Sequence, residues 1–168
     1  MLAGMSAYHD FTAAVEHDKN AAAEMFSRDS SLVNLRSSIG ETPFHYLAVE
    51  NDLESAKFLL KHGAQINTRN HFGQTPLINA ATLGYLDMCK FLVERGADFL
   101  LKAENGETAL SEAARKQNLE LVEYFLTKIV VDVNELFCDM DAEEVLTEPG
   151  PVCERLKACG LRRRYGNE

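Results

Sequence analysis

GQTPLINAAT, at residues 73–82, has two close counterparts in the chain, GETPFHYLAV at residues 40–49 and GETALSEAAR at residues 106–115. The leading glycines of the three segments lie 33 residues apart, and a threonine follows each of them two positions later. A fixed period of this length indicates a solenoid, because one such unit buries its apolar face only by stacking on its neighbours.

The residues around each threonine predict a pair of helices in every unit. Thr42, Thr75 and Thr108 are suited to N-cap a helix, since a hydroxyl group there accepts a backbone N–H. Proline follows two of them, at the first helical position, where no N–H is needed. A second apolar stretch follows in each unit, and Gly63 and Gly96 are placed to end it in a conformation open mainly to glycine. We therefore expect an all-α repeat fold.

The pattern of G-x-T-P-L-H, an alanine pair, a second apolar helix and a Gly-Ala turn resembles the ankyrin repeat over about residues 37–134. The resemblance implies a solenoid of helix-turn-helix units joined by β-hairpin loops. It also implies that His45, near Thr42, makes structural hydrogen bonds between neighbouring repeats. The third unit departs from the pattern at its end, where Ile129 and Val130 replace the Gly-Ala turn.

We expect the whole chain, residues 1–168, to form a single ankyrin-repeat domain. A shift of 33 residues places Phe11 on Phe44 and Asn34 on Asn67, which extends the repeat toward the N-terminus. The expected units are a degenerate N-terminal capping repeat at 10–36, repeats at 37–69, 70–102 and 103–136, a divergent C-terminal capping repeat at 137–160, and a flexible tail at 161–168.

Two short helices are expected in the C-terminal capping repeat. Asp141 with Glu144 resembles a capping box at the start of the first. Pro151 suits the first position of the second, which ends near Gly160 and has an apolar face formed by Val152, Leu156 and Cys159. The acidic residues of this region give the capping repeat the polar outer side that the end of a stack requires.

The composition excludes several classes of function. A formal net charge of -9 argues against a nucleic-acid binder, since phosphate binding needs clustered Lys and Arg. The same negative charge weakly favours a basic partner protein. The apolar runs are far shorter than the roughly 18 to 20 residues that cross a bilayer, and the first residues lack the pattern of a signal peptide. We expect a soluble, cytoplasmic protein that is a monomer because its ends are capped.

No motif for catalysis or for a cofactor stands out in the sequence. The nucleotide-binding glycine loops, G-x-S-x-G and H-E-x-x-H are all missing, so we predict no catalytic residue and no cofactor. The cysteines form no CxxC pair and the histidines lie in the other half of the chain, so no metal site is predicted. The cysteines are interpreted as small buried apolar residues.

The resemblance implies that a partner protein binds the tips of the hairpins and the exposed end of each first helix, which line a concave surface. Phe72 and Leu83 are the most suggestive anchors, because large apolar side chains on a surface are typical of binding sites. Carried over position by position, the candidate residues are Ile39, Glu41, Val49 and Glu50 in the first repeat, Arg69, His71, Phe72, Gln74, Thr82 and Leu83 in the second, and Lys102, Glu104, Asn105, Glu107, Arg115 and Lys116 in the third.

The leading hypothesis is a non-catalytic protein–protein interaction module. An alternative in the binding class is an inhibitor or immunity-type protein that occludes one enzyme or toxin. A more remote alternative is an enzyme or metal-binding protein that uses the C-terminal segment, and it depends on Cys138, Cys153, Cys159 and the clustered acids.

Overall fold

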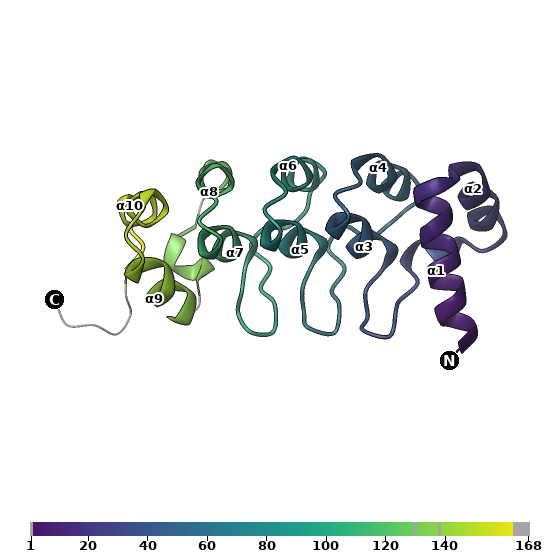
Figure 1. The fold of residues 1–168 in the computed structure, drawn as a ribbon, viewed down its shortest axis with the longest axis horizontal. Coiled ribbons are helices and arrows are strands. Elements are labelled where there is room, and N and C mark those ends of the chain that lie inside the picture. Colours follow the sequence, from purple (N-terminus) through teal and green to yellow (C-terminus); the bar gives the residue numbers. More distant parts are fainter. Residues whose placement is uncertain (1, 130, 138, 163–168) are drawn as a thin grey trace.

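The computed structural model describes residues 2–129, 131–137 and 139–162. In it, the helices stack side by side in an elongated array (Figure 1). These residues form ten α-helices and two short 3₁₀ helices. In chain order they are α1 (Leu2–His17), α2 (Lys19–Arg28), η1 (Ser30–Asn34), α3 (Pro43–Val49), α4 (Leu53–Lys61), α5 (Pro76–Thr82), α6 (Leu86–Glu94), α7 (Ala109–Arg115), α8 (Leu119–Leu126), η2 (Val133–Leu136), α9 (Asp139–Thr147) and α10 (Pro151–Ala158).

The helices form two rows, with the hairpin loops at one edge (Figure 1). The inner row contains α3, α5, α7 and α9, each packed on the next, and the outer row contains α4, α6, α8 and α10. The loops that join successive units project from the inner row, on the side away from the outer helices (Figure 1). This layout confirms the predicted all-α repeat fold.

The predicted N-caps form at two of the three threonines, while the Thr42 hydroxyl instead lies 3.0 Å from His45 Nδ1. Thr75 Oγ1 accepts a hydrogen bond from the backbone N–H of Ile78, and Thr108 Oγ1 accepts one from that of Ser111, at N···O distances of 3.3 and 3.1 Å. Proline occupies the first turn of α3 and of α5. Gly63 and Gly96 have φ of +88° and +91° just past α4 and α6, where a residue with a Cβ is strained.

The core is continuous from the first helix to the last. Small alanines on the inner helices lie between large apolar side chains, and this alternation lets neighbouring units approach closely. The largest fully buried side chains include Phe11, Phe44, Leu47, Leu59, Leu77, Ile78, Met88, Leu92, Leu110, Leu121, Phe125 and Leu156.

Helix α1 differs from the other inner helices in length and direction. It begins at Leu2, ahead of residue 10, where the N-terminal unit was expected to begin, and it runs from the level of the hairpins across the end of the stack toward the outer row (Figure 1). Phe11 and Val15 are fully buried, and the Val15 carbonyl accepts a hydrogen bond from the Ser55 hydroxyl at 3.0 Å. The helix therefore covers the apolar end of the first clear repeat.

The C-terminal helices correct three expectations. Helix α9 begins at Asp139, so Asp141 lies within the helix and the predicted start there is wrong. Cys153, not Cys159, joins the buried face of α10, because Cys159 follows the last helical turn and is exposed. Leu161 is buried and its N–H donates to the Leu156 carbonyl at 3.0 Å, so the tail does not begin there. Residues 163–168, together with Val130 and Cys138, lie outside the described residues.

Candidate functional site

The hairpins between the repeats form one hydrogen-bonded row. Within the second hairpin, the Asn70 N–H donates to the Gln74 carbonyl and the Gly73 N–H donates to the Asn70 carbonyl, both at 3.0 Å. Between hairpins, the His71 N–H donates to the Ile39 carbonyl at 2.9 Å, and the next hairpin repeats this bond from Glu104 to Phe72 at 3.0 Å. Each tip is therefore held in place by its neighbour.

Glycine is required where one hairpin approaches the next. Gly73 has φ of +72°, and a Cβ added to it would lie 2.8 Å from the Glu104 backbone nitrogen. Gly40 is in the same position one repeat earlier, where a Cβ would lie 2.5 Å from a ring carbon of His71. The recurring glycine thus allows a turn and a close contact at once.

Arg36 joins the first hairpin to the second. Its guanidinium donates to the carbonyl oxygens of Gly40 and Arg69 at 2.8 and 2.6 Å, and to the Thr68 hydroxyl at 3.1 Å. These are charge-assisted hydrogen bonds to backbone groups on both loops, and such bonds are stronger than neutral ones. The first two tips are consequently presented as a fixed pair.

His45 makes one hydrogen bond within its repeat and one to the next repeat, as the resemblance to ankyrin repeats implied. Its Nδ1 accepts from the Thr42 N–H at 3.1 Å, so Nε2 carries the hydrogen and donates to the Gln74 carbonyl at 3.0 Å. The ring is fully buried. Burial lowers the pKa of His45 from its ordinary value of 6.5 to about 4, which keeps the imidazole neutral near pH 7.

Every candidate binding residue named from the sequence is exposed or half-buried. The large apolar members are the most notable, because Phe72 is 56% exposed, Leu83 47% and Ile39 42%. Solvent-exposed side chains of this size are available for contact with another molecule.

The structure brings some of these residues together and separates others. Phe72, Gln74, Glu104 and Asn105 line one cleft of about 350 Å³ between the second and third hairpins. Lys102 lies in a neighbouring cleft of about 300 Å³ that also contains Leu100, Val131, Glu135 and Leu136. Ile39 and Glu41 line a third cleft, at the opposite end of the hairpin row and beside α1.

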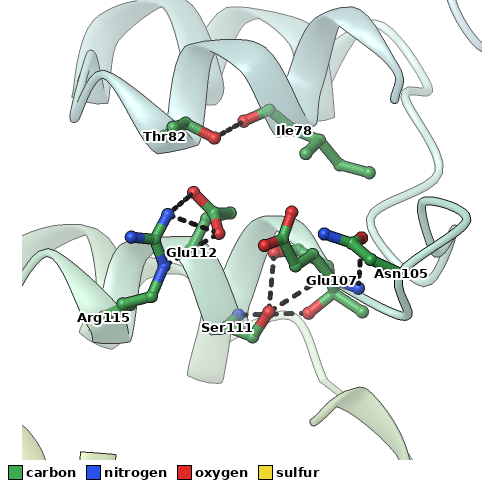
Figure 2. Close-up of polar contacts among 8 residues, drawn as sticks. Ile78, Thr82, Asn105, Glu107, Ser111, Glu112 and Arg115 are labelled. Carbon is green, nitrogen blue, oxygen red and sulfur yellow. Dashed lines mark hydrogen bonds and ion pairs between the residues drawn. The ribbon is translucent and has the colours of Figure 1, made fainter. Parts of the chain in front are cut away.

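Arg115 is occupied by an ion pair within its own helix. Figure 2 shows its guanidinium on the Glu112 carboxylate, with the shortest N···O distance 2.6 Å. Glu112 is buried and Arg115 is partly exposed, and hydrogen bonding to Glu112 raises the pKa of Arg115. Thr82 lies across from this pair on α5, where its hydroxyl donates to the Ile78 carbonyl at 2.9 Å (Figure 2). Arg115 is thus needed to neutralise a buried carboxylate.

Several residues that share a surface with the hairpins were not predicted from the sequence. Tyr8, His9, Glu16 and Tyr46 line the cleft beside α1, although none was named as a candidate. The signal was present in part, because the apolar positions of Phe11 and its neighbours predict a helix there. What the sequence does not encode locally is the direction in which α1 crosses the stack. Leu100 is 38% exposed but was not named as a candidate binding residue. It lies 33 residues after Asn67, at a repeat position where an asparagine was expected.

Two thiols of the C-terminal segment lie among the described residues, in different environments. Cys153 is buried, whereas Cys159 is exposed beside Arg155. Elsewhere, burial raises the pKa of the Cys89 thiol to about 12, so that thiol is protonated and unreactive near pH 7. Among the residues that the structure describes, no three His, Cys, Asp or Glu side chains are placed to hold a metal ion.

None of the helices in the described part of the chain is both long enough and apolar enough to cross a membrane.

Stacked helix pairs with a row of linked hairpins along one edge define the class of helical repeat proteins. The comparison with protein families agrees, since the family described as Ankyrin repeats (3 copies) matches residues 11–103 and again residues 69–137. The chain belongs to the ankyrin repeat family. Ankyrin repeats are generally protein–protein interaction modules and are typically non-catalytic. Among curated proteins, none matches this chain significantly.

Proposed function

We propose that this protein binds a partner protein through the hairpin row and the adjoining ends of the inner helices, and that it does so without catalysis. The observation that carries the proposal is Phe72, a large aromatic side chain that stands 56% exposed at a hairpin tip. Aromatic side chains at such positions contribute large contact area and are frequent energetic anchors of interfaces.

The surroundings of Phe72 support this role. Its hairpin is bonded to the hairpin before it and to the one after it, so binding loses little conformational entropy. Polar side chains of Gln74, Glu104 and Asn105 border the same cleft. An exposed apolar centre with a polar rim is the arrangement of a protein interface.

Affinity capture from native lysate tests the proposal. The variant Arg69→Ala/Phe72→Ala/Lys116→Ala removes exposed side chains from the hairpin row and from the end of α7, and we expect it to lose the partner. Arg115 is left unchanged because its removal would leave the buried Glu112 unpaired. The control is Lys57→Ala/Lys61→Ala on the outer helix α4, which removes the same number of positive charges and should capture normally.

Recovery of the same partner at the same level by the hairpin variant would show that the partner binds elsewhere. If the captured partner is an enzyme or toxin, its activity in the complex separates an occluding inhibitor from a scaffold.

A further inference from the structure

A cleft of about 420 Å³ lies between α1 and the first hairpin. One wall comes from α1, with Tyr8, His9, Thr12, Ala13 and Glu16, and the other from residues 37–39, Glu41 and Tyr46 of α3. The walls are held together, since Tyr8 is buried and its hydroxyl donates to the Thr42 carbonyl at 3.4 Å. The cleft is therefore a preformed feature of the N-terminal end.

The lining combines two tyrosine rings with two carboxylates. Burial raises the pKa of Tyr8, and the neighbouring charge of Glu41 raises it further. The side chains of Glu16 and Tyr46 are hydrogen-bonded, and burial raises the pKa of Glu41 itself. Each acid thus adjoins a ring, and the acids come from opposite walls. None of the described lining residues is Lys or Arg.

We propose that this cleft receives an arginine side chain of the partner protein, an inference that rests on the proposed function and specifies the chemistry of its partner. A guanidinium group stacks on an aromatic face through its plane and donates to carboxylates through its edge, so it suits the partly exposed ring of Tyr46 together with the two glutamates. Glu16 is hydrogen-bonded to Tyr46 and Glu41 to Asn70, and an apolar side chain in the cleft would desolvate both carboxylates further without adding a cation beside them. The net charge of -9 adds a long-range attraction for a basic segment.

The inference is tested directly on the isolated protein with Nα-acetyl-arginine amide as the probe. We expect the backbone amide NMR signals of Ala13, Ile39 and Tyr46 to shift in a saturable way and to shift less at high salt. The isosteric probe Nα-acetyl-citrulline amide has no charge and should leave these signals in place. Equal shifts with both probes, or no shift with either, would overturn the inference.

Paired variants assign the effect to this cleft. Glu16→Gln/Glu41→Gln keeps the shape of the lining and should weaken arginine binding about tenfold, because hydrogen bonds to charged groups and the ion pairs are lost. Glu94→Gln/Glu120→Gln removes two exposed acids from the outer helices and should bind the probe as the unaltered protein does. Far-UV circular dichroism checks that all variants are folded. Unchanged probe affinity in the first variant would also overturn the inference.

The two proposals fail separately. If the arginine probe does not bind but capture still depends on Arg69, Phe72 and Lys116, the cleft inference is wrong and the proposed function stands. If the probe binds but no partner depends on the hairpin row, the cleft recognises arginine and the proposed function is wrong.

Discussion

The His45 imidazole is buried between two repeats and is hydrogen-bonded through both ring nitrogens. Its pKa lies near 4 in the folded protein and at 6.5 when the chain is unfolded. Between these values the unfolded chain binds a proton that the folded protein does not bind, so the free energy of unfolding falls as the pH decreases from 6.5 toward 4.

We expect this one side chain to account for about 2 kcal/mol of the stability lost between pH 7 and pH 5. Urea unfolding of the unaltered protein and of His45→Gln at both pH values measures it. The variant is less stable at pH 7, but its loss on acidification should be smaller by that amount. Equal losses in the two proteins would show that His45 does not titrate in this range.

A second residue-scale prediction concerns the buried pair of Glu112 and Arg115. Arg115→Ala should lower the free energy of unfolding by about 2 kcal/mol, because it leaves a buried carboxylate without its partner. Adding Glu112→Gln should restore part of the loss, since an amide is cheaper to bury than a charge. Urea unfolding of both single variants and the double variant tests this. If the two effects add without recovery, Arg115 acts through packing alone.

At the scale of the elements, the hairpin turns and the helix ends depend on glycine for different reasons. Gly73 and Gly96 both have positive φ, but only at Gly73 would a Cβ meet the backbone of the next hairpin. Gly96→Ala should therefore cost about 1 kcal/mol, and Gly73→Ala about 3 kcal/mol, because strain and a clash combine there. Thermal and urea unfolding of the two variants compares them. Equal costs would mean that the hairpins shift freely relative to one another.

Asparagines at the ends of three units connect their layers to the next, while Leu100 takes that position in the second repeat. Asn34 bonds to Gly63 and Gln65 of the following repeat, and Asn67 accepts from the Asp98 N–H at 2.9 Å. Asn134 makes the corresponding bonds to Gly160 and Arg162 in the C-terminal unit. The divergent ends are thus joined to the array by the same contact as the central repeats.

The parts of the fold that depend on local signals were predictable from the sequence. Thr75 and Thr108 cap their helices, and Gly63 and Gly96 end theirs, because each acts on backbone groups a few residues away. The direction of α1 and the start of α9 were not predictable, since they depend on packing between distant segments. The cleft containing Tyr8 was missed for that reason.

At the scale of the whole molecule, Phe72 and the tyrosine and glutamate cleft lie at different places along the hairpin row. Phe72 stands at the centre of the hairpin row, and the tyrosine and glutamate cleft lies at its N-terminal end. A partner with an apolar surface followed by a basic segment would fit this arrangement. The proposed function and the inference about arginine together describe one interface along one edge of the stack.

Site-specific photo-crosslinking tests the central claim most directly. A photoreactive phenylalanine analogue at position 72 should form a covalent adduct with the partner in native lysate, because this side chain lies at the proposed interface. The same analogue at position 57, exposed on the outer helix α4, should form none. An adduct from position 57 with none from position 72 would contradict the account and place the partner on the opposite face of the stack.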